Sequence, residues 1–455
     1  MRKMKCLTSK KSIWVLLVFA SLQLSTIQAQ ETQEKLTLTL GQAIEIALAE
    51  NPTIIVAGQE IELKKEAKRE AYGGLLPEAS LVGNFQHAIK KQSVTMDFGE
   101  GPMTLEMGSK NTYNGGLNIS LPVFAPALYK AISLTKTDID LAVEKSRASE
   151  QDLINQVTKA FYQLLLAQDG YQVLLKSYDQ SVANYNIVEA RFKQGLVSEY
   201  DKIRADVQTR SIKPSVVAAK NGVELAKLNL KVLIALDADI DIVLEGNLRE
   251  HEMEMFQTEL SDRNTDVMAN TNLRQLDINA ELLRKNLKLQ QTNFMPTLGL
   301  GFNYTYMTMA EDFKFNNYNW TPYSMLNVSL TIPLFKASNF TKIKQTRIQM
   351  SQLSNQRINL ERQLKMQAES YRKNMAASTE QVISNRENIV QAEKGRTIAQ
   401  KRYEVGNGTI LELNDSEVAL TQAELTYAQS IYDYLVAKAD LDMVLGKETE
   451  YKSGN

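Results

Sequence analysis

Two acidic residues near the C-terminus, Glu412 and Asp415, have the side chains whose types and spacing most directly suggest a chemical role. A helix is predicted to follow Gly406, and residues three apart on a helix share one face. Carboxylates gathered on one face attract cations. The alternative is an ordinary solvated helix face, where acidic pairs at this spacing are common.

Few other residues could carry chemistry. The chain has one cysteine, Cys6, and two histidines, His87 and His251, which are too few for a zinc cluster or a disulfide. Met253 and Met255 lie beside His251 and could bind a soft metal, but methionine at such positions more often packs against its neighbours. We find no nucleophile paired with a base and no phosphate-binding loop. The sequence therefore predicts no enzymatic activity, no metal site and no cofactor.

The balance of charged residues and the N-terminal segment limit which classes of protein are possible. The 52 Lys and Arg residues against 53 Asp and Glu residues leave no basic excess, so nucleic acid is not an expected partner. Residues 1–12 are basic, residues 13–24 are apolar, and Ile27-Gln28-Ala29 offers a cleavage site. We therefore predict a secretory signal peptide over 1–29. Its removal would leave a mature chain with no cysteine and a formal net charge of −6.

The mature chain is an internal repeat. Leu121-Pro122-Val123-Phe124 matches Ile332-Pro333-Leu334-Phe335 at an offset of 211 residues, and Arg191 to Gly195 matches Arg402 to Gly406 at the same offset. Leu76-Pro77 matches Met295-Pro296 at an offset of 219, so the first repeat has eight additional residues between its prolines. The predicted organisation is a first repeat (30–236), a bridging segment (237–262), a second repeat (263–446) and a tail (447–455).

Each repeat is predicted to hold one β-hairpin, at about 77–122 and about 296–333. Apolar and polar residues alternate from Leu298 to Tyr306 and again from Leu326 to Ile332. Such strands fit a sheet with lipid on one side and water on the other, although a soluble amphipathic hairpin would show the same pattern. Beyond residue 29 no stretch approaches the ~20 apolar residues of a transmembrane helix. Any membrane-spanning part would therefore have to be a β-barrel.

The remaining segments are predicted to be long helices. Apolar residues from Tyr171 to Phe192 recur at steps of mostly three and four, which is typical of a coiled coil. A helix from Ala125 to Gln194 would extend about 105 Å. Each repeat would then turn, near Gly195 or Gly406, into a returning helix, and Pro214 is expected to kink or break the first of these.

These features together resemble the TolC-like outer membrane efflux proteins. Leu40 to Pro52 resembles the opening signature of that family, and the two proline-bounded strand pairs and two Arg-aromatic-x-x-Gly turns occur in its order. The resemblance implies a mainly α fold with a β-barrel part. Long antiparallel coiled-coil helices would form two structural repeats, and four transmembrane strands per subunit would complete a twelve-stranded barrel in a homotrimer. The helices would form a hollow periplasmic tunnel.

The resemblance also implies roles for particular residues. The turns would be the tips on which a periplasmic membrane-fusion adaptor docks, with Gly195, Leu196, Val197 and Ser198 in the first turn and Gly406 and Thr409 in the second. Asp201 and Tyr403 match an entrance gate closed by a polar network, and Glu412 and Asp415 match a pore-lining acidic ring. A basic residue often found in the second turn is replaced by Gly408, so Lys202 or Arg204 could take its place. Alternatively, Asp201 is an ordinary acid in the first turn of a helix.

Three classes of function are compatible with these patterns to different degrees. The first is an outer-membrane duct in a Gram-negative bacterium, passively conducting substrates from a periplasmic adaptor and an inner-membrane pump to the exterior. The second is a periplasmic or surface coiled-coil scaffold, which leaves the alternating strands unexplained. The third is an enzyme, for which no catalytic residues are found. The sequence favours the duct.

Overall fold

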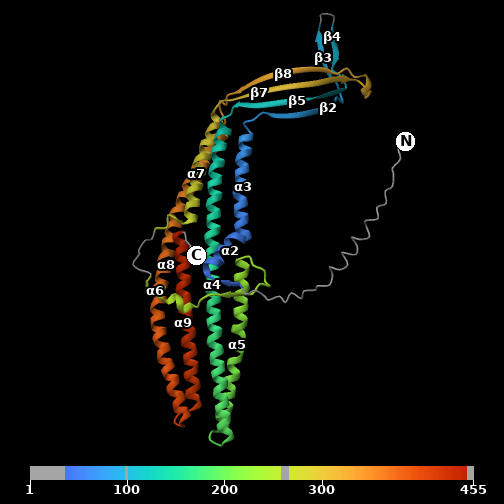
Figure 1. The fold of residues 1–455 in the computed structure, drawn as a ribbon. Coiled ribbons are helices and arrows are strands. Elements are labelled where there is room, and N and C mark those ends of the chain that lie inside the picture. Colours follow the sequence, from blue (N-terminus) through green and yellow to red (C-terminus); the bar gives the residue numbers. More distant parts are fainter. Residues whose placement is uncertain (1–35, 98–100, 258–265, 448–455) are drawn as a thin grey trace, which may run out of the picture.

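The computed structural model describes residues 36–97, 101–257 and 266–447. The predicted signal peptide lies outside these residues, as do most of the predicted tail and the end of the bridging segment. The molecule is elongated. Long helices lie side by side over most of its length, and a β-sheet lies at one end (Figure 1). None of the helices in the described ranges is both long and apolar enough to cross a membrane.

Two helices of 68 residues each run through the molecule, α4 (Pro126–Lys193) and α8 (Ala337–Glu404). At 1.5 Å per residue each is about 100 Å long. Two shorter helices pack end to end along α4, and two more pack in the same way along α8 (Figure 1). These are α3 (Pro52–Gly73) and α5 (Glu199–Leu233) on α4, and α7 (Thr271–Gln291) and α9 (Ile410–Leu445) on α8. The two repeats therefore have the same helical arrangement.

Local sequence sets where these helices begin. Thr39 and Gln42 form a capping box at the start of α2 (Leu40–Glu50), and Asn51 caps α3, whose first residue is Pro52. These caps satisfy backbone N–H groups that have no partner in the first turn. Pro214 was expected to kink or break the returning helix, and it does not break it: α5 continues through Pro214 to Leu233. Pro214 is exposed, so water can solvate the backbone carbonyl that loses its N–H partner.

The four-stranded sheet is antiparallel, in the order β2-β5-β7-β8. Its strands are β2 (Glu78–His87), β5 (Asn111–Phe124), β7 (Thr297–Ala310) and β8 (Thr321–Thr331). The register places Leu81 opposite Leu117, Ile119 opposite Phe302, and Phe302 opposite Leu326. Because side chains alternate between the faces of a strand, most apolar residues of the four strands share one face, and the other face is mainly polar but also carries Val82, Met307 and Tyr323.

The additional residues of the first repeat form structure of their own. β3 (Gln92–Asp97) and β4 (Pro102–Met107) pair as a second, two-stranded hairpin between β2 and β5. This hairpin projects from the end of the sheet that is remote from the helices (Figure 1). In the second repeat the corresponding connection contains only a short 3-10 turn, η3 (Phe315–Asn317).

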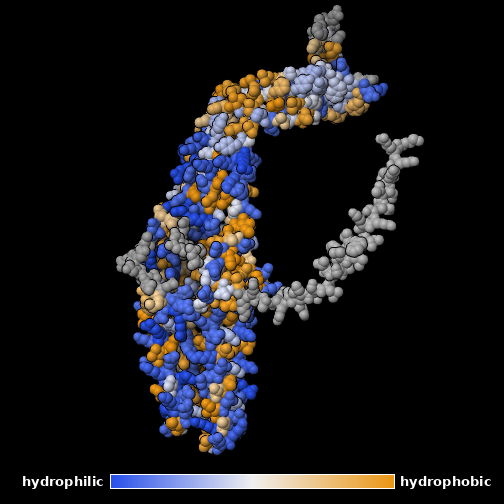
Figure 2. All heavy atoms as spheres, in the orientation of Figure 1, coloured by the Kyte–Doolittle hydropathy of each residue, from blue (hydrophilic) through white to orange (hydrophobic). Residues whose placement is uncertain are grey.

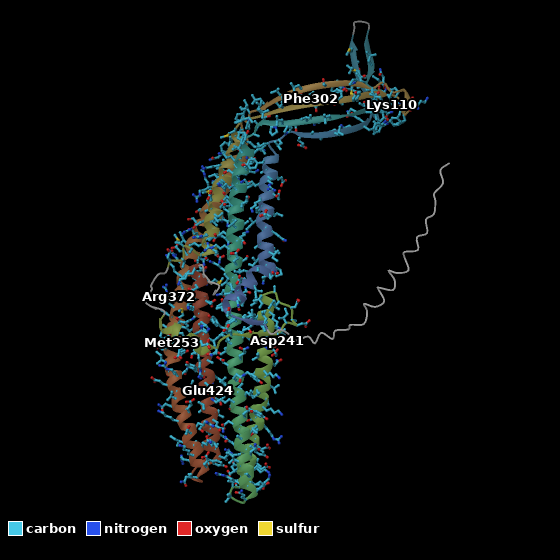
Figure 3. The ribbon with its side chains drawn as sticks, viewed as in Figure 1. Lys110, Asp241, Met253, Phe302, Arg372 and Glu424 are labelled. Atoms are coloured by element: carbon cyan, nitrogen blue, oxygen red, sulfur yellow. The ribbon has the colours of Figure 1, made fainter. Side chains whose placement is uncertain are left out.

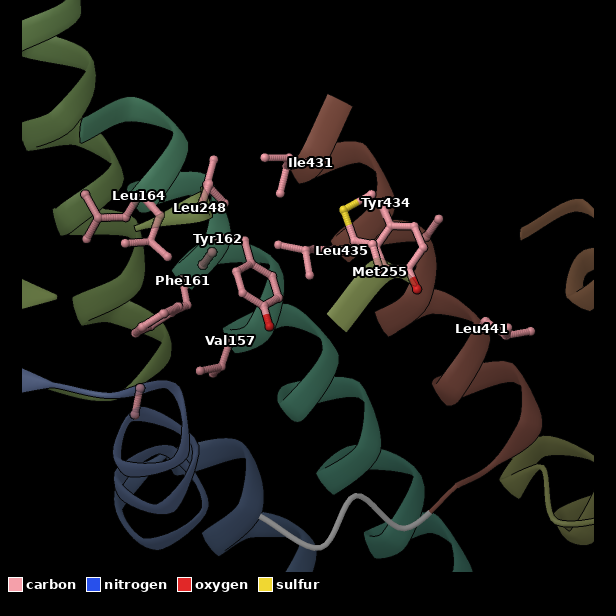
Figure 4. Close-up of a cluster of buried hydrophobic side chains, with 14 of the residues drawn as sticks. Val157, Phe161, Tyr162, Leu164, Leu248, Met255, Ile431, Tyr434, Leu435 and Leu441 are labelled. Carbon is pink, nitrogen blue, oxygen red and sulfur yellow. The ribbon is translucent and has the colours of Figure 1, made fainter. Parts of the chain in front are cut away.

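The main hydrophobic core lies halfway along the helices, where the bridging segment crosses them. There a parallel pair of short strands, β1 (Leu36–Leu38) and β6 (Ile242–Leu244), packs with η1 (Leu248–His251) and α6 (Glu252–Gln257) against the long helices. Figure 4 shows Tyr162 of α4, Leu435 of α9 and Met255 of α6 converging in this core. Fully burying a side chain of this size contributes about 1.5–3 kcal/mol. The core thus fixes α4 against α9 and joins the two repeats.

Candidate functional site

The two helical tips lie at the end of the molecule opposite the sheet (Figure 1). Gly195 and Gly406 have φ angles of +73° and +81°, a left-handed conformation that glycine adopts without strain. Ser198 then caps α5 and Thr409 caps α9 through its hydroxyl and the backbone N–H of Glu412. Leu196 is exposed, whereas Val197 packs toward the other tip.

A small apolar cluster holds the two tips together within one chain. It joins one or two residues from each of four helices: Val188, Ala205, Tyr403, Ile410 and Leu413. Tyr403 is 7% exposed, and burial raises the pKa of its phenol. Its hydroxyl makes no hydrogen bond within the described part of the chain. The ring of Tyr403 is therefore a packing element between the tips.

Asp201 makes its hydrogen bonds locally, at the start of α5. Its carboxylate accepts hydrogen bonds from the backbone N–H and the hydroxyl of Ser198, at 3.2 and 2.7 Å, completing a capping box. No hydrogen bond joins it to Tyr403 in the described residues, although its charge is close enough to contribute to the raised pKa of that phenol. Lys202 lies 3.6 Å from Glu189, and Arg204 stacks over Tyr200. In this conformation neither cation takes the place of the missing basic residue beside Asp201.

Arg191 provides the cross-link that the sequence analysis missed. Its guanidinium donates to the backbone carbonyls of Tyr403 and Glu404 at 3.0 and 2.9 Å, and it lies 5.3 Å from the Tyr403 ring centroid. These carbonyls belong to the last turn of α8, where the helix dipole favours a cation. Arg191 of the first tip therefore binds the end of the second.

Glu412 and Asp415 lie on one exposed face of α9. Toward the C-terminal end of α9, every third or fourth residue after them is also exposed. Together these exposed residues include no cationic side chain: Glu412, Asp415, Ala419, Gln422, Thr426, Gln429 and Asp433. We call these residues the α9 polar stripe. Arg402 lies 3.4 Å from Glu412, whereas Asp415 takes part in no ion pair within the described ranges. Asp415 is thus the less compensated of the two negative charges.

Two further carboxylates lie buried on the opposite side of α9, in the seam with α4. The Glu417 carboxylate accepts a hydrogen bond from the Asn184 amide at 2.6 Å and lies 4.0 Å from the Nε of Arg396. Two turns away, Glu424 pairs with Lys176 at 3.1 Å (Figure 3). Burial raises the pKa of Glu417 despite the opposing effects of Asn184 and Arg396. The sequence signal was available, because Glu417 and Glu424 are seven apart in an otherwise apolar heptad stripe.

Metal binding gains no support from the residues near His251. Met253 is exposed (Figure 3), while Met255 is buried in the core (Figure 4), so their sulfur atoms do not converge. Among the described residues, no group of three or more His, Cys, Asp or Glu side chains is placed to hold a metal ion.

Comparisons with known proteins agree on one family. A family described as "Outer membrane efflux protein" matches residues 43–235 and 268–447. The chain is 21% identical over 438 residues to the outer membrane protein TolC of Vibrio cholerae, covering 95% of each protein. The Campylobacter jejuni CmeC outer membrane channel has a TM-score of 0.68 at 16% identity, over 90% of this chain and 85% of that one. The open state of the Neisseria gonorrhoeae MtrE outer membrane channel has a TM-score of 0.69 at 16% identity, over 90% and 88%.

Proposed function

The chain belongs to the outer membrane efflux protein family, a family of TolC-like channels, and from this premise we propose that it is the outer-membrane duct of a tripartite export system. In this role it conducts substrates passively from a periplasmic adaptor and an inner-membrane pump to the exterior of a Gram-negative cell. The single observation that carries the proposal is a sheet with one apolar face and two unpaired edges at the end of long helices. A coiled-coil scaffold would need neither feature.

The sheet supports membrane insertion as part of a closed barrel. Leu326, Val328 and Leu330 of β8 are more than 60% exposed, and hydrophobic side chains cover much of the sheet (Figure 2). Strands β2 and β8 are edges, and an unpaired strand edge cannot remain in lipid. Four strands are too few to close a barrel. We propose that three copies supply twelve strands, the number that the family implies.

The helices support the same assembly. α5 exposes apolar residues along one side, including Ile203, Val207 and Val217, and α8 does the same with Ile383, Val390 and Ile398. Exposed apolar stripes on long helices are typical of surfaces that other helices cover. By contrast, the α9 polar stripe suits a surface that faces water. We propose that neighbouring copies cover α5 and α8, and that the α9 polar stripe lines the tunnel.

The tips suit a docking surface for the periplasmic adaptor. We assign adaptor docking to Gly195, Leu196, Val197, Ser198, Gly406 and Thr409, and closure of the entrance to Asp201 and Tyr403, together with Arg191. Support for closure comes from Arg191, which binds the carbonyls of the second tip, and from the apolar cluster around Tyr403. Glu412 and Asp415, at the start of α9, would form the acidic ring next to this entrance.

The mass and the channel conductance of the purified protein test the proposed trimer. We expect the mature protein to need detergent and to have the mass of three chains, because the sheet edges and the apolar stripes must be covered. Light scattering with the detergent contribution subtracted measures that mass, and planar-bilayer recording measures conductance. A water-soluble monomer without channel activity would refute the duct.

A second prediction tests docking at the tips. Gly406→Val should sharply reduce export in cells, because a β-branched residue at φ +81° is strained by roughly 1–3 kcal/mol and must reshape the turn. The trimer should persist, since the sheet is at the other end. Gly395→Val is the matched control, because Gly395 lies within α8 with open space around it. Normal export by Gly406→Val would remove this tip from the docking surface.

A further inference from the structure

The β3–β4 hairpin lacks partners within its own chain. It forms a two-stranded sheet separate from the four-stranded one, and no other helix or strand of the described residues packs extensively against it. An isolated two-stranded hairpin is only marginally stable in water, and stability normally requires a third strand or a covering surface. The hairpin therefore needs contacts that a single copy of the chain does not provide.

The two faces of the hairpin differ in chemistry. The register groups the side chains into a mainly apolar face (Val94, Met96, Leu105 and Met107, with Gln92 opposite Met107) and a polar face (Ser93, Thr95, Thr104, Glu106). On the polar face the hydroxyls of Thr95 and Thr104 lie 3.0 Å apart. On the apolar face Met96, Leu105 and Met107 remain 42%, 47% and 56% exposed. A regular amphipathic pattern of this kind specifies one face for burial.

Charged residues at the base of the hairpin argue against lipid as the covering material. Lys91 binds Glu311 at 2.6 Å, and Lys90 and Lys110 are exposed beside it. Figure 3 places Lys110 at the end of the sheet, below the hairpin. Charged side chains are costly in the hydrocarbon region, so they mark where the sheet leaves it. The apolar face beyond them is therefore surrounded by water and requires protein to cover it.

The position of the hairpin indicates which protein covers it. The hairpin continues directly from β2, an edge strand whose free side must pair with another copy of the chain if the barrel closes. It thus stands at the junction between copies. We propose that the apolar face of the β3–β4 hairpin packs against a neighbouring copy of this chain outside the membrane, an inference that rests on the trimer proposed above.

Photo-crosslinking on adjacent residues tests this contact in the full-length protein. Benzoylphenylalanine is placed at Leu105 on the apolar face or at Thr104 on the polar face, and the purified protein is illuminated in outer membrane and in detergent. We expect the Leu105 derivative to lose most of its single-chain band to products with the masses of two and three chains. The Thr104 derivative should retain it. Met107 and Glu106 form a second matched pair.

Three results would overturn the contact, and they are distinguishable from failure of the duct. Equal two-chain products at Leu105 and Thr104 would mean that the contact is not specific to the apolar face. Products with lipopolysaccharide or another protein, or no product, in a sample that light scattering shows to contain three chains would exclude the neighbouring copy while leaving the duct intact. A monomeric mass would refute the trimer itself, and the contact with it.

Discussion

Replacing both acids at the start of the α9 polar stripe, in Glu412→Gln/Asp415→Asn, should abolish the cation selectivity of the channel. In a trimer, six carboxylates would surround the entrance, and such a field raises the local cation concentration on the order of tenfold or more. The two amides remove the charge with little change of shape. Planar-bilayer recording should show the cation-to-anion permeability ratio falling toward one, and block by multivalent cations from the periplasmic side should disappear.

The single variants should differ in size of effect. Arg402 already compensates Glu412 at 3.4 Å, so Asp415→Asn should account for more of the loss than Glu412→Gln. Glu199→Gln/Asp206→Asn is the matched control, because it removes the same number of charges near the first tip but from α5. Wild-type selectivity in the double α9 variant would place the stripe on the outer wall, as an ordinary solvated helix face.

The mainly helical fold could be predicted because its signals are local and periodic. Apolar spacing of three and four identified the long helices, and alternation with period two identified strands where the structure has β7 and β8. The β3–β4 hairpin was not foreseen. The sequence comparison showed only that the first repeat has eight additional residues, and only the paired register shows that Val94 and Leu105 share a face.

The contacts at the tips were harder to predict because they join the two repeats. Arg191 binds the carbonyl of Tyr403, which is 212 residues away, and Asn184 binds Glu417 across 233 residues. No periodicity encodes which helices meet at such a separation. Asp201 presents a different difficulty, because its partner is local. Its carboxylate was expected to act in a network between the tips, but it accepts a hydrogen bond from the hydroxyl of the nearby Ser198. The sequence resemblance implied entrance roles for Asp201 and Tyr403 but could not assign their partners.

Acidification should hold the entrance closed through Glu417. In the opening proposed here, the tips part and the seam between α4 and α9 loosens, which would hydrate this carboxyl and return its pKa toward the ordinary value near 4.5. Burial raises the pKa in the closed seam, so the closed form binds the proton more tightly. The closed seam is therefore stabilised as the pH falls through the raised pKa and loses that stabilisation as the pH rises through it.

Bilayer recordings should show spontaneous opening decrease in the wild type as the pH is lowered from neutral through the raised pKa of Glu417, which lies above the ordinary glutamate value. Glu417→Gln should be insensitive to pH over this range and should open rarely throughout, since its amide resembles the protonated acid. Glu424→Gln, which removes the carboxylate that pairs with Lys176, is the control that should keep the pH response. Equal pH responses in all three proteins would exclude Glu417 as the titrating group.

Asn184→Leu should have the opposite effect and should open the entrance. It removes the donor 2.6 Å from Glu417 and leaves a buried carboxylate whose nearest remaining charge, on Arg396, is 4.0 Å away. Losing a hydrogen bond to a buried charge costs about 1.5–3 kcal/mol, which corresponds to roughly a ten- to hundredfold shift toward the open form per chain. Glu417→Gln in the Asn184→Leu background should reverse much of the effect, because no unpaired charge then remains in the seam. A double variant as open as Asn184→Leu alone would mean that packing, not the buried charge, controls the seam.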